Sequence, residues 1–257
     1  MVLLSFLVVT GCSRRDILDD YPVSGVEVRL DWSGVTEKLP EGVRIIFYPK
    51  DEKGRKIDTY LSVTGGEVKV PSGHYAVVIY NYDTETVLIR GEESYETIQA
   101  YTNFCKLGIA GTEKMVWGPD PLYVVNIDDL DIQNSEETLI LKLKPKLVIR
   151  TYSFSIKVQG LSNVSNVIGS IGGMADHYFL GKAYAMCDDY PINIDLNVKA
   201  GKIEGAFTTF GLPEAIITRL EIKLPVMMNL MIIKVDNSVQ EVKINITEAV
   251  QEPTGGG

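Results

Sequence analysis

The chain is a succession of short β-type runs, and no amphipathic helical pattern separates them. Residues 26–32 and 67–70 alternate apolar and polar side chains with the period of two that is typical of half-buried strands. Residues 43–48 and 74–80 are denser in β-branched and aromatic residues, and the second of these runs predicts a central buried strand. Three further runs lie at residues 86–89, 122–125 and 138–143. Strands at this spacing predict an all-β chain built of β-sandwiches.

The chain divides at Lys144-Pro145-Lys146, because proline interrupts what would otherwise be one continuous strand. A second set of strands is expected at residues 147–158, 163–174, 192–198, 216–224, 230–235 and 239–246. We therefore expect two tandem β-sandwich domains, at residues 25–144 and 145–250. A polar stalk at residues 12–24 precedes them, and a flexible tail with three terminal glycines follows at residues 251–257.

The N-terminus has the features of an export signal. Residues 2–10 form an apolar run far shorter than the roughly 20 residues that a membrane-spanning helix needs, but long enough for a signal peptide. The run ends at Val9-Thr10-Gly11-Cys12, which resembles the bacterial lipobox. We expect residues 1–11 to be removed as a lipoprotein signal peptide and Cys12 to carry acyl chains such as palmitate. The alternative is a buried N-terminal strand with an incidental cysteine, since no Lys or Arg precedes the run.

A lipidated Cys12 would place the protein at a membrane. Each buried CH₂ group contributes about 0.8 kcal/mol, so more than one acyl chain makes the attachment stable. The expected location is the cell envelope, as an outer-membrane lipoprotein on its periplasmic or its exposed face.

Two more cysteines, Cys105 and Cys187, follow in the chain. An oxidising compartment would allow a disulfide between them, but the sequence does not show that their Cα atoms come within reach. Two separate thiols that pack as small hydrophobic groups are the alternative that we favour. Zinc ribbons and thioredoxin chemistry are excluded, because the sequence has no CxxC pair.

The charge and the histidine content argue against several functions. The chain has 25 Lys and Arg against 34 Asp and Glu, which gives a net charge of −9. Such a surface repels phosphate backbones, so we expect no nucleic-acid partner. Only 2 His leave little room for a His-based metal site or catalytic triad.

Enzyme and cofactor motifs are incomplete in this chain. Residues 168–172 do not match G-x-S-x-G, and Gly181-Lys182 lacks the glycine and the hydroxyl residue of a phosphate-binding loop. The acidic residues 126–131 lack the calcium-loop pattern, and we expect a solvated loop there. His74 and His177 are interpreted as structural. The sequence therefore predicts a non-enzymatic protein with no cofactor and no metal.

Aromatic residues offer the only candidate contact site in the sequence. Trp117 and Tyr123 flank Gly118-Pro119-Asp120-Pro121, and a rigid aromatic loop of this kind can stack on a glycan or dock a partner subunit. Trp117 and Tyr123 are therefore candidate contacts to a ligand or a partner. The alternative is that these rings fill the core of the sandwich.

Several segments together resemble the fimbrillin-like lipoproteins of Bacteroidetes, and especially the branch that contains fimbrial anchor subunits. They are Asp31-Trp32, residues 40–49, Gly65–Val68, and Pro71-Ser72-Gly73-His74-Tyr75. In that family a Pro-x-Gly-x-Tyr turn leads into a central strand of a transthyretin-like sandwich. Residues 168–175 and 178–180 are similar to the start of the family's second domain.

This resemblance implies two transthyretin-like (Greek-key) domains in tandem, lipidated at the N-terminal cysteine and held at the outer membrane. Some members anchor or terminate a fimbrium, in which subunits exchange edge strands. Ser13-Arg14-Arg15 departs from the acidic run that often follows the cysteine. The favoured hypothesis is a non-enzymatic envelope lipoprotein that acts as a fimbrial anchor, a minor subunit or a fimbrillin-like protein of cell adhesion. The alternative is a surface lipoprotein that binds glycans or nutrients, as the loop at Trp117 suggests.

Overall fold

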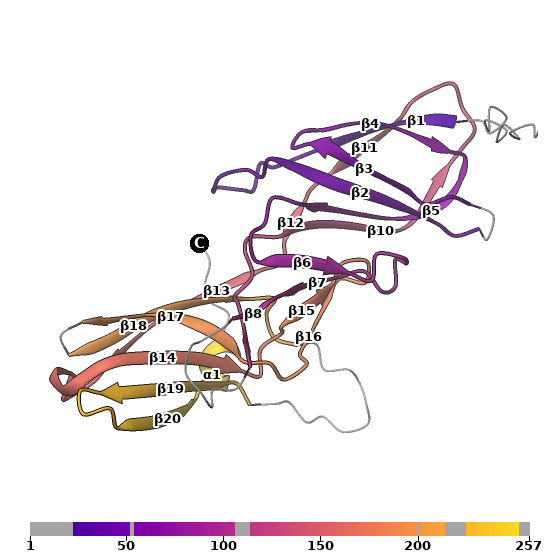
Figure 1. The fold of residues 1–257 in the computed structure, drawn as a ribbon. Coiled ribbons are helices and arrows are strands. Elements are labelled where there is room, and N and C mark those ends of the chain that lie inside the picture. Colours follow the sequence, from indigo (N-terminus) through magenta and orange to yellow (C-terminus); the bar gives the residue numbers. More distant parts are fainter. Residues whose placement is uncertain (1–22, 52–53, 106–113, 200, 214–224, 252–257) are drawn as a thin grey trace, which may run out of the picture.

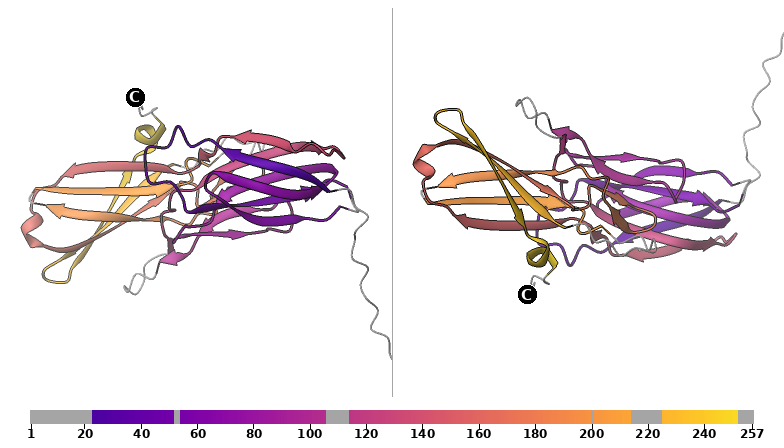
Figure 2. Two further views of the ribbon diagram at one scale, coloured as in Figure 1. Left: turned by 90° about the horizontal axis from the view of Figure 1, so that it is seen from above. Right: turned by 90° about the horizontal axis from the view of Figure 1, so that it is seen from below.

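The computed structural model describes residues 23–51, 54–105, 114–199, 201–213 and 225–251 (Figure 1). Within these ranges the regular structure is 20 strands, the short helix α1 (Thr247–Gln251) and one 3-10 turn, η1 (Leu161–Asn163). The predicted all-β sandwich class is confirmed. The strands form two lobes that lie end to end, as the two views of Figure 2 show.

The first lobe is one curled sheet with the strand order β11-β1-β4-β3-β2-β5-β10-β12. Its strands are β1 (Val23–Leu30), β2 (Gly42–Pro49), β3 (Ile57–Ser62), β4 (Gly65–Pro71), β5 (Gly73–Asn81), β10 (Tyr123–Ile132), β11 (Leu139–Leu143) and β12 (Lys146–Leu147). Neighbours run antiparallel except β1 and β11, which are parallel. The curl brings alternate side chains of these strands together in one core.

The central strands β2 and β5 are buried on both faces. Ile45 and Val77 point into the curl of the first lobe. Ile46 and Val78, their neighbours in sequence, point outward into a second core. Neither face of these two strands meets water. Their sequences are therefore rich in apolar residues and do not alternate apolar with polar ones.

A four-stranded sheet, which we call the bridging sheet, covers that outer face. Its order is β16-β15-β7-β6, with β6 (Val87–Arg90), β7 (Gln99–Thr102), β15 (His177–Phe179) and β16 (Tyr184–Met186). Ile98, Leu180 and Ala185 pack from this sheet and its turns into one core with Ile46 and Val78 of the first lobe. The bridging sheet therefore combines two strands from each half of the chain.

The second lobe is a sheet with the order β13-β18-β17-β14-β19-β20. Its strands are β13 (Arg150–Lys157), β14 (Val164–Gly172), β17 (Ile192–Lys199), β18 (Lys202–Thr209), β19 (Met227–Lys234) and β20 (Val239–Asn245). The short strands β8 (Phe104–Cys105) and β9 (Met115–Val116) join it through the parallel pair Val116–Ile192. Val167, Ile203 and Leu230 are buried in its single core.

The domain boundary predicted between residues 144 and 145 falls between β11 and β12. Strand partners are exchanged across it, since β7 pairs with β15 and β9 pairs with β17. The predicted stalk was too long by two residues, because Val23 and Ser24 already pair with Pro71 and Val70 in the sheet.

Besides residues 12–22 of the stalk, three sequence predictions lie wholly or partly outside the described residues. They are the signal peptide with Cys12, the strand at residues 216–224, and residues 252–257 of the tail. In the part of the chain that is described, no helix has the length and apolar character to cross a bilayer.

Candidate functional site

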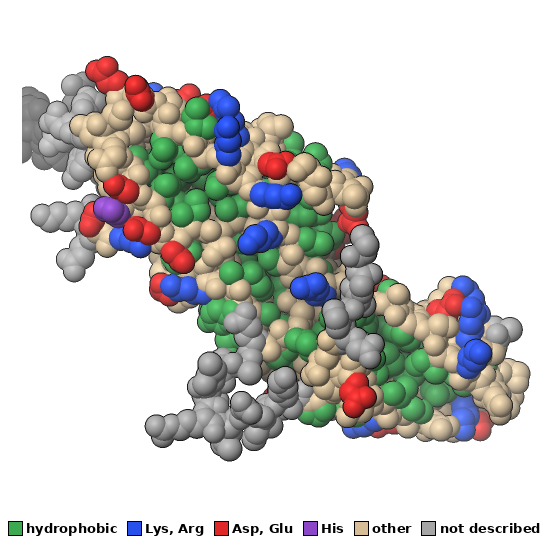
Figure 3. Space-filling view, turned by 180° about the vertical axis from the view of Figure 1, so that it is seen from behind, with side chains coloured by type: hydrophobic (Ala, Val, Ile, Leu, Met, Phe, Trp, Pro, Cys, Tyr) green, Lys and Arg blue, Asp and Glu red, His purple; other side chains and the backbone are tan. Residues whose placement is uncertain are grey.

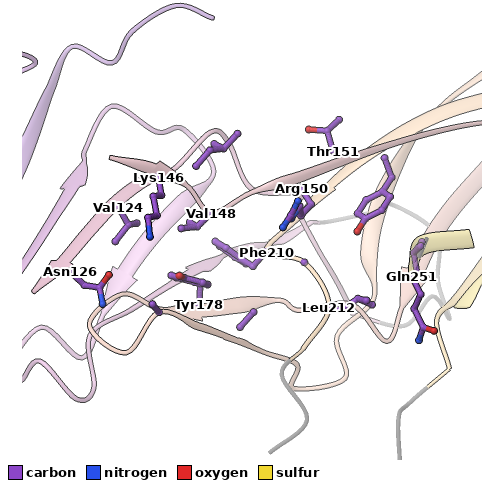
Figure 4. A pocket seen from close by; sticks show the side chains of 16 residues that line it. Val124, Asn126, Lys146, Val148, Arg150, Thr151, Tyr178, Phe210, Leu212 and Gln251 are labelled. Carbon is purple, nitrogen blue, oxygen red and sulfur yellow. The ribbon is translucent and has the colours of Figure 1, made fainter. Parts of the chain in front are cut away.

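A groove of about 710 Å³ lies between the two lobes (Figure 4). Val124 and Asn126 of β10 and Lys146 of β12 line it from the first lobe. Arg150 at the start of β13 and Gln251 at the end of α1 line it from the second. At the groove the chain passes directly from β12, an edge of the first sheet, through Val148 and Ile149 to β13, an edge of the second.

The floor of the groove is apolar and well packed. The ring of Phe210 is stacked on that of Tyr178, with centroids 6.3 Å apart and an interplanar angle of 22°. Phe210 is only 4% exposed, and Val148 is half-buried beside it in the same core. Asn126 donates from Nδ2 to the carbonyl oxygen of Gly181 at 3.1 Å. This bond ties β10 to the turn that follows β15 and fixes one wall of the groove.

The charge of the groove is opposite to that of the whole chain. Lys146 and Arg150 line it, and none of the other described residues around it is an Asp or Glu. Neither cation forms an ion pair with any described residue. The face seen in Figure 3 shows Lys and Arg side chains in a row that runs from the first lobe toward the second. A concave site of this composition attracts anions to a molecule whose net charge is −9.

Unpaired strand edges border the groove and the second lobe. Among the described residues, β12 pairs only with β10, β13 only with β18, and β20 only with β19. Ser153 and Ser155 of β13 are exposed, whereas Phe154 faces the core. An edge of this kind presents free backbone N–H and C=O groups to which another strand can add.

A compact cluster of Asp176, His177 and Asp188 lies where the bridging sheet meets the second lobe. Their ligand atoms lie within 4.8 Å of one another, a spacing that could hold a metal ion. The His177 Nδ1–H donates to Asp176 Oδ1 at 2.6 Å, since a carboxylate can only accept. Asp176 Oδ2 accepts the backbone N–H groups of Asp188 and Tyr190 at 2.9 and 3.3 Å. These bonds already occupy the buried carboxylate, so the geometry supports a structural clamp.

The structure separates the two predicted aromatic contacts. Trp117 is 41% exposed, and its assignment as a contact residue stays a prediction. Tyr123 is only 6% exposed and packs edge-on against Trp32, with centroids 5.3 Å apart. Tyr123 therefore belongs to the core of the first lobe, which is the alternative that the sequence left open.

The acidic segment at residues 126–131 is a strand, so the expectation of a solvated loop was wrong. It belongs to β10 and contains a register shift between Ile127 and Leu130. Asp128 accepts a hydrogen bond from the Tyr95 hydroxyl at 2.8 Å. The Lys50 ammonium holds the pKa of Asp129 below its ordinary value, and the exposed His74 lies 3.4 Å from the same carboxylate.

Cys105 and Cys187 are both free thiols in the structure, in agreement with the favoured alternative. Burial raises the pKa of Cys187 to about 11, which keeps the thiol protonated at neutral pH.

Sequence reasoning missed Lys146 and Arg150 as site residues. The signal was present in residues 142–150, which read KLKPKLVIR and carry four cations without an acid in an otherwise acidic chain. Only the fold shows that two of these cations line one groove.

Comparisons with known proteins agree with this architecture. Residues 11–195 match the sequence model of a family described as a domain of unknown function (DUF5119). Over 261 residues the chain is 52% identical to a Bacteroides ovatus protein with the provisional name fimbrium anchoring subunit Fim4B. The match covers 97% of this chain and 78% of that protein.

Two solved structures are also similar to this chain. A Bacteroides ovatus protein that is provisionally described as an adhesin is 51% identical, with a TM-score of 0.84 over 96% of this chain and 92% of that one. The fimbrial anchor protein Mfa2 from Porphyromonas gingivalis matches with a TM-score of 0.57 over 91% of this chain and 86% of its own. Its identity is 14%, so this second likeness concerns the fold alone.

Proposed function

The chain belongs to the DUF5119 family, and we propose that it is a non-enzymatic fimbrium anchoring or minor subunit held at the bacterial cell envelope. The observation that carries this proposal is the 52% identity, over 97% of the chain, to a protein named as a fimbrium anchoring subunit. The matched region covers nearly the whole chain, so it includes both lobes and the bridging sheet.

The proposed attachment to the membrane is a lipid on Cys12. The apolar run and the Val9–Cys12 motif support it. In the native host, mass spectrometry is expected to find an N-terminal acylated Cys12 without residues 1–11, and Cys12→Ser is expected to move the protein from the membrane to the soluble fraction. An unmodified thiol with residues 1–11 still attached would contradict the lipid anchor.

The proposed contact with other fimbrial subunits is strand addition at β13. Its outer edge is unpaired among the described residues, and an antiparallel or parallel strand could complete the sheet there. A photo-crosslinking amino acid at the exposed Ser155 tests this contact in the native host. The matched control is Asp195, which is also exposed but lies on β17 with a neighbouring strand on each side.

We expect an adduct with a second fimbrial protein from position 155 and none from position 195. Adducts of equal yield from both positions, or no adduct with any fimbrial subunit, would contradict strand addition at this edge. The lipid experiment is independent of this result, so the two parts of the proposal can fail separately.

A further inference from the structure

The groove between the lobes selects for negative charge. Among the described residues it is lined by Lys146 and Arg150 and by no Asp or Glu, and neither cation has an acidic partner there. The chain as a whole has 34 acidic residues and a net charge of −9. An anionic partner is therefore repelled by most of the surface and attracted at this place, because salt at about 0.1 M screens charges only beyond about 10 Å.

The shape of the groove suits an extended chain. Lys146 belongs to β12 and Arg150 begins β13, and both strands are edges of their sheets among the described residues. Four residues of extended backbone span at most about 13 Å. In Figure 4, Val148 and Phe210 lie between the two cations. Carboxylates on one face of an added strand repeat every second residue, so such a strand can reach both cations in one register.

The apolar parts of the groove favour a peptide over an acidic polysaccharide. Leu147 and Leu212 are 50% and 37% exposed beside the cations, and they offer contacts to aliphatic side chains. An open aromatic face would instead favour a sugar ring. Phe210 is only 4% exposed, and the two tyrosine rings that line the groove, Tyr178 and Tyr152, are stacked on Phe210 and Phe207, so one face of each is covered.

We propose that the groove between the lobes binds an extended acidic segment of a partner protein, with Lys146 and Arg150 as the carboxylate-binding residues. The inference goes beyond the anchoring role, because neither a lipid on Cys12 nor strand addition at Ser155 requires an acidic ligand in the groove. It therefore applies to the purified chain without a membrane or a fimbrium.

The test measures binding of a labelled dodecapeptide of alternating Glu and Thr to the full chain by fluorescence anisotropy. In an extended conformation this peptide carries its carboxylates on one face, and a shift by two residues leaves the charge pattern unchanged. Lys146→Glu/Arg150→Glu is compared with Lys142→Glu/Lys157→Glu, a control with the same change in net charge at exposed positions that do not line the groove. Circular dichroism verifies that both variants are folded.

We expect the groove variant to weaken binding roughly tenfold or more, and the control variant to change it by about twofold at most. Binding is also expected to weaken as NaCl rises from about 0.05 to about 0.3 M, and to be lost when Gln replaces Glu in the peptide. The proposal is overturned if the acidic peptide does not bind, if both variants weaken it equally, or if a galacturonate hexamer binds more tightly than the peptide.

Discussion

Arg44 is the side chain that connects most elements of the first lobe. Its guanidinium contacts Asp58 of β3 at 2.7 Å and Glu92 after β6 at 2.5 Å, and it donates to the Tyr80 hydroxyl of β5 at 2.8 Å. Hydrogen bonds to Asp58, and then to Glu92, raise the pKa of Arg44 above its ordinary value. The side chain is only 17% exposed, so these bonds are little screened by solvent.

We predict that Arg44→Met lowers the free energy of unfolding by about 2 kcal/mol, which lies between the values for exposed and fully buried pairs. The loss arises because Asp58 and Glu92 keep their charge without the cation between them. Chemical denaturation measures it. Arg29→Met is the control, since Arg29 and Glu27 form a pair with both side chains exposed, and we expect a loss of about 0.5 kcal/mol or less there. Equal losses would refute the role of the Arg44 network.

At the scale of elements, Asp176 holds the bridging sheet to the second lobe. Its carboxylate is 5% exposed and accepts hydrogen bonds from His177 and from two backbone N–H groups of the segment before β17. Asp176→Ala is expected to cost about 3 kcal/mol, because the buried His177 and two part-buried backbone N–H groups lose their acceptor. Hydrogen exchange of the β15 amides is expected to accelerate in the same variant.

Asp188→Ala is the matched control for this prediction. The Asp188 carboxylate is 53% exposed and lies 3.9 Å from both His177 and Arg90, so we expect a loss of about 0.5 kcal/mol. If the two variants have the same stability and the same exchange of β15 amides, Asp176 does not clamp the sheet.

The individual strands differ in how well the sequence predicts them. β2 and β5 were found because eight or nine residues of apolar β-type sequence give a clear pattern. β15 has only three residues and β9 has two, which is too few for any period. Their strand conformation depends on partners far away in sequence, namely β7 and β17. Strand β18 was missed because Gly205 and Ala206 interrupt its alternation.

The arrangement of the site could not be predicted for a related reason. The cations of residues 142–150 are visible in the sequence, but their common groove requires two lobes placed end to end. Tyr123 and Trp117 look equivalent in sequence, and only the packing of Tyr123 against Trp32 separates them. A single sequence contains the residues of such a site but not the tertiary contacts that expose or bury them.

At the scale of the whole molecule, the exchange of strands makes the two halves of the chain depend on each other. Leu180 and Phe210 of the second half are buried in the core that covers β2 and β5 of the first half. Separation of the halves would expose both side chains, at a cost of about 1.5–3 kcal/mol each. β15 would also lose its partner β7, and β17 would lose β9.

We therefore predict that residues 145–257, expressed alone, do not unfold cooperatively, although they contain all six strands of the path from β13 to β20. The full chain is expected to give one calorimetric transition, because the bridging sheet joins both lobes in one core. Co-expression of residues 12–144 with residues 145–257 is the complementary measurement, and the two fragments are expected to purify as a complex. Two transitions in the full chain, with the second one reproduced by the isolated fragment at the same temperature, would show that the lobes are independent domains despite the strands that they exchange.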